Sequence, residues 1–124
     1  MEIEAFTRWF DNYGAAWENR DSAALGDLFD PDGLYRANPF DDGVRGSEQI
    51  VTEWMEAFEE DSDEAFEFRH ELIAVDGDVG VVQGWIEYLG GEKVGKWRNL
   101  FVVKLSSEGR CRDYLEWYFQ DPDR

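Results

Sequence analysis

The chain has 124 residues, of which 29 are acidic and 12 are basic, so its formal net charge at pH 7 is −17. Such a surface repels phosphate backbones and anionic lipid headgroups, and we therefore expect neither nucleic acid nor a membrane as a partner. Hydrophobic residues make up 43% and aromatic residues 16% of the chain, too much for a disordered protein and enough for the core of a single domain, residues 1–124.

The acidity has two interpretations, and the sequence leaves both open. It is the surface of a very soluble protein, or it is an adaptation to a high-salt cytoplasm, where mobile cations screen the self-repulsion. The N-terminal segment is acidic and amphipathic, without the basic and then apolar pattern of a signal peptide, and no apolar stretch approaches about 18 residues. We therefore expect a cytoplasmic location.

Residues 2–20 have the spacing of an amphipathic helix. Large apolar side chains recur at i, i+3, i+4, i+7 and i+11 and share one face: Phe6, Trp9, Phe10, Tyr13 and Trp17. Asp21 and Ser22 are suitable caps for a second, short helix, which the turn sequence of residues 30–33 is expected to end.

Between residues 34 and 60 the pattern predicts a short strand, a loop and a third helix. Residues 34–37 are the strand candidate, and Pro39, Gly43 and Gly46 indicate a loop over residues 38–46. Ser47 is a suitable N-cap for the third helix. The apolar face of that helix carries Ile50, Val51, Trp54 and Phe58. The acidic run of residues 59–64 is interpreted as a solvated helix end and loop.

From Phe66 onward the hydrophobic period becomes two, which is typical of strands. Phe66, Phe68, His70, Leu72 and Ala74 alternate with charged residues, apart from Ile73. The turn sequences at residues 76–78, 90–91 and 106–109 then separate four consecutive strands. The order helix, helix, strand, helix and four strands predicts an α+β domain, in which three helices cover the concave face of a curved antiparallel sheet.

Two segments carry a family resemblance: NRDSAALGDLFDPDGLY at residues 19–35 and RNLFVVKLSSEGRCRDYLEWYF at residues 98–119. Together with the element order they resemble the NTF2-like superfamily, in particular SnoaL-like domains, over essentially the whole chain. The resemblance implies a cone-shaped α+β barrel with a deep pocket, often dimeric. It does not specify a reaction, because the superfamily includes isomerases, cyclases, epoxide hydrolases, dehydratases and non-catalytic domains.

Two enzymes of the superfamily provide a residue-level comparison. Ketosteroid isomerase needs a tyrosine on the first helix, a carboxylate base before a proline and a protonated acid on a late strand. Tyr13 matches the tyrosine, but the base position is Asn38 and the acid position is Phe101, so its usual chemistry is not expected. The Asp-Arg-Asp set of the superfamily's epoxide hydrolases is also missing around Arg98, because no carboxylate lies within residues 96–104.

The same comparison predicts which side chains face the pocket. On the strand from Arg98 it places Asn99, Phe101 and Val103 inward. On the last strand Glu116 and Tyr118 face inward, unless a bulge exchanges them for Leu115 and Trp117. The expected pocket lining is Trp17, Asn38, Phe40, Trp54, Asn99, Phe101 and Tyr118.

Glu116 is the first candidate for chemistry. A carboxylate among aromatic side chains has a raised pKa and suits general acid or base catalysis. The alternative is that Glu116 lies on the outer face and pairs with Arg98. Tyr13 is a candidate donor to a substrate oxygen, or else a core residue. His70, the single histidine, is either a catalytic group or a hydrogen-bonded core residue.

We expect no metal and no cofactor, because the one histidine and the one cysteine, Cys111, lack partners at ligand spacing. Two functional hypotheses remain. The first is a SnoaL-like enzyme or binding protein with a mostly apolar pocket for a small, oxygen-bearing hydrophobic molecule. The second is a non-catalytic binding or dimerisation module. Trp85, Leu100 and Trp117 are expected on the outer face, which predicts a homodimer through the convex side of the sheet.

Overall fold

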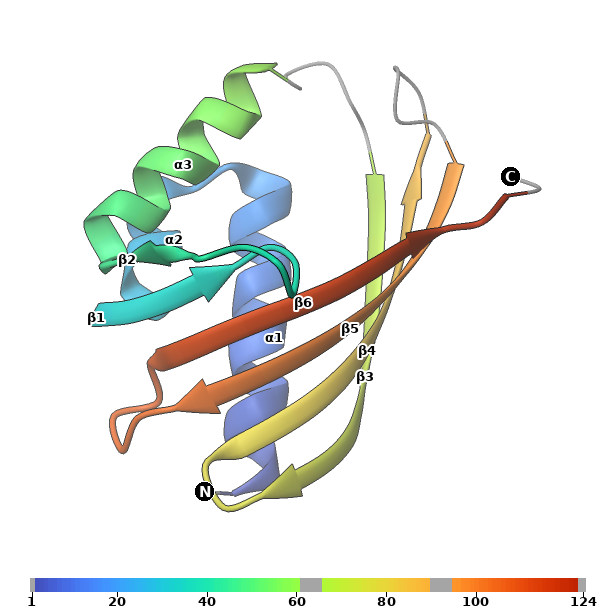
Figure 1. Ribbon diagram of the computed structural model, residues 1–124. Coiled ribbons are helices and arrows are strands. Elements are labelled where there is room, and N and C mark those ends of the chain that lie inside the picture. The colour runs from blue at the N-terminus through green and yellow to red at the C-terminus, as the bar shows by residue number, and fades with distance from the viewer. Residues whose placement is uncertain (1, 61–65, 90–94, 123–124) are drawn as a thin grey trace.

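Figure 1 shows the computed structural model, which describes residues 2–60, 66–89 and 95–122. In these residues the chain forms three helices and six strands. In chain order they are α1 (Ile3–Asn19), α2 (Ser22–Asp27), β1 (Phe29–Arg36), β2 (Val44–Arg45), α3 (Ser47–Glu60), β3 (Phe66–Asp76), β4 (Val79–Tyr88), β5 (Gly95–Leu105) and β6 (Cys111–Gln120). The predicted α+β class is confirmed, with the helices in the first half and the strand meander in the second.

The strands form one curved sheet with the order β2-β1-β6-β5-β4-β3. Strands β3 to β6 are antiparallel, as predicted, but β1 pairs with β6 in parallel, so the sheet is mixed rather than wholly antiparallel. The parallel pairing follows from the entry of β1 after α2, where the Cys111 amide donates to the carbonyl of Leu28 at 2.7 Å. β2 and β3 are the two edges of the described sheet, which is therefore open.

α1 lies along the concave face of the sheet, and α3 lies over the end that carries β1 and β2 (Figure 1). The predicted aromatic face of α1 is buried: Phe6, Trp9, Phe10 and Tyr13. The indole Nε1 of Trp9 donates to the carbonyl of Leu28 at 2.9 Å, which connects α1 to the start of β1. Burial of these rings provides much of the hydrophobic stabilisation and fixes α1 against the sheet.

The corner between α1 and α2 has the chemistry that the sequence indicated. α1 ends at Asn19, and the residue that caps it, Arg20, adopts the left-handed conformation with φ of 52°. The side chain of Asp21 then caps α2 by accepting a hydrogen bond from the Ala24 amide at 3.1 Å. α3 begins at Ser47 itself, directly after Gly46 with φ of +94°, instead of using Ser47 as the residue before the helix.

Three local predictions are corrected. β1 begins at Phe29, so residues 30–33, expected to be a turn, belong to an irregular strand in which Asp30 Oδ1 accepts from the Asp32 amide. The loop expected over residues 38–46 contains β2, which pairs with β1. In β3 a bulge between Leu72 and Ala74 reverses the alternation, so Ala74 is exposed, against expectation.

The central strands place their side chains as predicted. Asn99, Phe101 and Val103 are buried on the concave side of β5, and Leu100 between them is exposed. On β4, Gly84 makes room for an aromatic ring, because a Cβ atom there would lie 2.8 Å from the ring of Phe101. The missing side chain at residue 84 leaves the space that the edge of the Phe101 ring occupies.

Some predictions concern parts of the chain outside the described residues. These are the turn at Gly90–Gly91 and most of the acidic run of residues 59–64, together with the side chain of Phe58. Within the described residues, no helix is long and apolar enough to cross a membrane.

Candidate active site

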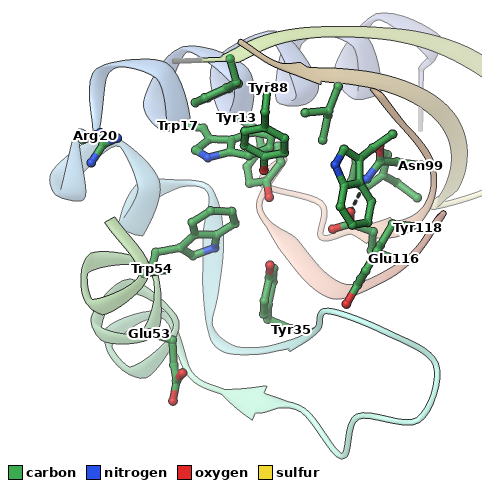
Figure 2. A pocket seen from close by; sticks show the side chains of 15 residues that line it. Tyr13, Trp17, Arg20, Tyr35, Glu53, Trp54, Tyr88, Asn99, Glu116 and Tyr118 are labelled. Carbon is green, nitrogen blue, oxygen red and sulfur yellow. Dashed lines mark hydrogen bonds between the residues drawn. The ribbon is translucent and has the colours of Figure 1, made fainter. Parts of the chain in front are cut away.

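A cavity of about 490 Å³ lies between α1, α3 and the concave face of the sheet. This volume is within the range of roughly 300–1,000 Å³ that is usual for small-molecule sites. Aromatic rings form most of the wall, and Figure 2 shows Trp54 reaching into it from α3 and Tyr35 from β1. Among the described residues, the strongly polar side chains of the wall are Arg20, Glu53, Asn99 and Glu116.

Glu116 faces this cavity from β6. Its Oε1 accepts a hydrogen bond from the Tyr114 hydroxyl at 2.8 Å, and its Oε2 accepts one from the Asn99 amide Nδ2 at 2.5 Å. The register irregularity between β5 and β6 lies at Lys104/Leu105, and beyond it Glu116 is opposite Phe101. The structure therefore places Glu116 on the inner face, and the alternative of an outer-face pair with Arg98 is not what the fold shows.

Two opposing effects set the pKa of Glu116. Burial raises the pKa from the usual 4.5 to about 7, while the hydrogen bonds from Tyr114 and Asn99 act in the other direction. Desolvation is the larger effect, because charged oxygen loses more in leaving water than two neutral donors restore. At neutral pH both protonation states are therefore populated, which is the condition for a general acid or base.

Three tyrosines from three elements converge beside Glu116. The hydroxyls of Tyr13 on α1 and Tyr114 on β6 are 3.1 Å apart, and the ring of Tyr35 on β1 stacks on that of Tyr114 with centroids 4.6 Å apart. Burial raises the pKa of all three phenols well above 10, and the charge of Glu116 adds to the effect. They are therefore neutral hydrogen-bond donors at physiological pH.

Asn99 connects the carboxylate to the rest of the wall. It is 5% exposed, and its Nδ2 is used by Glu116. Its Oδ1 and the indole Nε1 of Trp97, two residues earlier on the same face of β5, are buried and have no hydrogen-bond partner within the described residues. Both residues line the cavity, and the two atoms themselves are covered, so the wall contains one acceptor and one donor that no described group uses.

The structure brings most of the predicted site residues to this cavity: Tyr13, Trp17, Trp54, Asn99, Phe101, Glu116 and Tyr118. Asn38 and Phe40 do not line it, against expectation, and Phe40 is 95% exposed. The reason is local, because Asn38 Oδ1 accepts from the Phe40 amide at 2.9 Å and closes a tight turn that directs Phe40 away from the protein.

His70 lies elsewhere. It faces inward from β3, as predicted, but into a separate hollow that it shares with Phe10 and Asp11. Its Nε2 is 3.1 Å from the Asp11 carboxylate, and its ring contacts those of Phe10 and Phe68. His70 therefore has the surroundings of a structural residue that joins α1 to β3, and it does not meet Glu116 in the cavity.

Sequence reasoning missed Tyr35, Tyr114 and Trp97. Tyr114 carried a usable signal, because it lies two residues before Glu116 and thus on the same face of the strand. Tyr35 carried none, since its approach to Tyr114 depends on the parallel pairing of β1 with β6.

Within the described residues, no group of three His, Cys, Asp or Glu side chains is arranged to hold a metal ion. Cys111 is buried, its Sγ donates to the carbonyl of Asp113 at 3.3 Å, and burial raises the pKa of its thiol above the usual range. A neutral, enclosed thiol is a poor ligand and a poor nucleophile.

The open, curved sheet, the three helices and the aromatic cavity define the NTF2-like class of α+β domains. The family model of the SnoaL-like domain matches residues 6–120, and the chain belongs to this family. No match was found among curated protein sequences.

Solved structures share this fold at low sequence identity. A protein from Shewanella denitrificans OS-217, provisionally described as a SnoaL-like polyketide cyclase, aligns with a TM-score of 0.75 at 16% identity, over 95% of this chain and 92% of its own. An LEH-like epoxide hydrolase from M. tuberculosis aligns with a TM-score of 0.73 at 17% identity, over 90% and 80%.

A third neighbour is a SnoaL-like protein of unknown function from Burkholderia thailandensis E264, with a TM-score of 0.71 at 21% identity, over 96% of this chain and 98% of its own. Identities this low establish the shared fold and leave the activity to be argued from the site.

Proposed function

We propose that this protein is an enzyme that binds a small, oxygen-bearing hydrophobic molecule and uses Glu116 as its general acid or base. The observation that carries the proposal is the Glu116 carboxylate, held by Tyr114 and Asn99 in the wall of an aromatic cavity. A buried carboxyl group with a pKa near 7 is costly to maintain for structure alone, and such groups gather at catalytic sites.

The side chains of the cavity wall favour a neutral, largely apolar ligand. Aromatic rings surround the cavity, and the ionised form of Glu116 repels anionic groups in a protein whose net charge is already −17. Oxygen atoms of the ligand have hydrogen-bond partners among the tyrosines that line the cavity. This favours ketones, alcohols and phenols over acids and phosphates.

The chemistry that suits one carboxyl group and several neutral phenols is proton transfer. Glu116 removes a proton from a C–H or O–H group, and the phenols stabilise the charge that develops on a substrate oxygen. Isomerases, cyclases and dehydratases use such steps. Hydrolysis of an epoxide is less well supported, because the described wall contains no Asp and holds Arg20 and Glu53 on elements other than β6.

A ligand screen tests the proposal. Thermal shifts in high KCl would be recorded with aromatic ketones, terpenoid alcohols and epoxides, polyketides and fatty acids, for the wild type and for Glu116→Gln. A ligand at 100 times its Kd adds about 2.7 kcal/mol to the unfolding free energy. We expect a neutral oxygen-bearing compound to stabilise the wild type. Glu116→Gln should lose the ability to convert this compound, and not only the ability to bind it.

Glu53→Gln is the matched control, since Glu53 is an exposed carboxylate of the same wall. Equal turnover in Glu116→Gln and the wild type would contradict the proposal that Glu116 is the general acid or base. A cavity that takes up no compound of any class would favour a non-catalytic dimerisation module instead.

A further inference from the structure

A second hollow lies along the first half of α1, apart from the cavity that Glu116 faces. Its volume is about 370 Å³, which is also usual for a small-molecule site. α1 forms one side of the hollow, and β3, an edge strand of the described sheet, forms the other (Figure 1). Among the described residues none lines both spaces, since the hollow uses α1 up to Asp11 and the cavity uses it from Tyr13 onward.

The floor of the hollow is apolar and mostly aromatic. α1 contributes Phe6 and Phe10, β3 contributes Phe68 and Leu72, and β4 contributes Val82. Phe6 packs directly on the backbone of β4, because a Cβ atom at Gly80 would overlap the Phe6 ring. Three phenylalanine rings on one floor favour contact with the face or edge of another aromatic ring.

His70 lies beside this floor, and its ring is held from three sides. Nε2 is 3.1 Å from the Asp11 carboxylate, and the imidazole contacts the rings of Phe10 and Phe68, with centroids 5.7 Å and 5.6 Å away. A carboxylate only accepts hydrogen bonds, so we assign the proton of the neutral imidazole to Nε2. The other nitrogen, Nδ1, then holds a lone pair that can accept a hydrogen bond.

The protein does not use His70 Nδ1. Within residues 2–60, 66–89 and 95–122, the polar partner of the His70 ring is Asp11, and the contact is made by Nε2. Nδ1 is not one of the buried polar atoms that lack a partner, so it is not sealed inside the core. Because His70 lines the hollow and its side chain is 18% exposed, a molecule in the hollow has access to this acceptor.

We propose that this hollow is a second binding site, which takes a small neutral aromatic molecule with one hydroxyl group, as in a phenol. The ring of the ligand covers the phenylalanine floor, and its O–H donates a hydrogen bond to His70 Nδ1. Asp11 occupies Nε2 and so leaves Nδ1 free to accept. The site shares no described residue with the Glu116 cavity, and it is therefore independent of the proposed catalytic function.

The charged groups around the hollow favour a neutral ligand. The Asp11 side chain is 64% exposed at the rim, and its charge repels carboxylates and phosphates, as does the net charge of −17. Arg69 is engaged elsewhere, because its guanidinium lies over the Trp85 ring, 4.5 Å from the ring centroid. A protonated phenol avoids the repulsion and supplies the donor that Nδ1 lacks.

The first test is the protonation of the His70 ring, which is readily observed because the chain contains a single histidine. In protein with ¹⁵N-labelled histidine, the two ring nitrogens give separate NMR signals, and a pH series locates the range in which the imidazole is neutral. We expect the proton on Nε2 and the lone pair on Nδ1. A neutral ring with its proton on Nδ1 would overturn the proposal.

Phenol is then titrated into the intact protein in that pH range, and toluene serves as the ligand of similar shape without a hydroxyl group. The methyl signals of Leu72 and Val82 report on the floor, and the Nδ1 signal of His70 reports on the hydrogen bond. We expect phenol to shift all of them to saturation with a Kd of about 1 mM or lower. A response that does not saturate by about 10 mM phenol would refute the site.

His70→Phe removes the acceptor and keeps an aromatic ring. The Kd for phenol, read from the two methyl groups, should rise about 5-fold or more, while that for toluene should stay within about 2-fold. An equal change for both ligands would assign the effect to packing and overturn the hydrogen bond. If His70→Phe does not fold, the wild-type Nδ1 signal decides, since phenol must shift it and toluene must not.

Ala57→Trp is the control for binding in the other space. Ala57 lines the Glu116 cavity from α3, and a tryptophan there fills part of that cavity. Leu72 and Val82 should respond to phenol with the wild-type Kd in this variant. Loss of their response would show that phenol acts from the Glu116 cavity, which would overturn the second site and leave the proposed function standing.

Discussion

At the scale of single residues, the site is dominated by the balance between burial and hydrogen bonding at Glu116. Two donors hold the carboxylate, yet desolvation leaves its pKa near 7. A group whose pKa rises on folding binds its proton more tightly in the folded state. Between the two pKa values the unfolded state releases that proton first, so folding becomes less favourable as the pH increases.

This balance gives a prediction for stability. As the pH rises from 4.5 to about 7, the ionisation of Glu116 increasingly opposes folding. The total loss of unfolding free energy is on the order of 3 kcal/mol and is reached only above pH 7. We expect the wild type to lose stability between pH 5 and pH 8 relative to Glu116→Gln, measured by urea unfolding at fixed salt. Parallel pH profiles of the two proteins would contradict the raised pKa.

At the scale of elements, the fit between β4 and β5 determines the shape of the cavity wall. Gly84 leaves space that the Phe101 ring fills, and a Cβ atom at Gly84 would lie 2.8 Å from that ring, 3.2 Å from Phe68 and 3.3 Å from Asn99. A side chain at residue 84 would therefore displace Phe101 and Asn99 together. The position of Asn99, which donates a hydrogen bond to Glu116, thus depends on Gly84 of the neighbouring strand.

Gly84→Ala is expected to destabilise the protein by about 1–3 kcal/mol, the usual cost of overpacking a core. The measurement is the urea midpoint at unchanged m value. Gly26→Ala is the matched control. Gly26 lies in α2, and a Cβ atom there would meet the side chain of Val51 in α3 at an ordinary distance of 3.4 Å. It should be neutral or stabilising by up to about 1 kcal/mol. Similar losses in both variants would argue against the packing explanation.

At the scale of the whole molecule, the outer face of the sheet is unusually apolar for so acidic a protein. Phe119 is 73% and Leu100 37% exposed, and the half-buried rings of Trp85 and Trp117 lie beside them in the strand register. The alternation in sequence predicted Trp85, Leu100 and Trp117 on this face, and the structure adds Phe119 to them. We propose that a second copy of the chain covers it across a two-fold axis.

Light scattering or sedimentation at micromolar concentration checks the dimer. Leu100→Glu should convert the dimer to a monomer without loss of the fold, because it puts two like charges in the interface. Ile73→Glu is the control, being an exposed apolar residue of β3 at the sheet edge. A monomeric wild type would refute the proposed interface.

The net charge of −17 gives a prediction for salt. If the acidity is an adaptation to high salt, the melting temperature should rise as KCl increases from millimolar to molar concentration, since cations screen the self-repulsion. A melting temperature that stays flat over this range would support the interpretation as an ordinary soluble acidic protein. Sodium chloride at equal ionic strength separates screening from an effect specific to potassium.

The family and much of the architecture could be predicted from the sequence because they rest on local patterns. The aromatic spacing of α1, the cap at Asp21 and the alternation along β5 each depend on neighbouring residues, and each is found in the structure. The inward direction of Asn99 and Phe101 followed from the same alternation.

What the tertiary structure alone decided are the contacts between distant residues. Tyr13 and Tyr114 are 101 positions apart, and their meeting depends on the register of β6 and the irregularity at Lys104/Leu105. The parallel pairing of β1 brings Tyr35 to the same place. A hydrophobic period of two residues indicates which side chains share a face of a strand. Strand order, strand direction and bulges arise from packing across the whole chain, and they decide which faces meet.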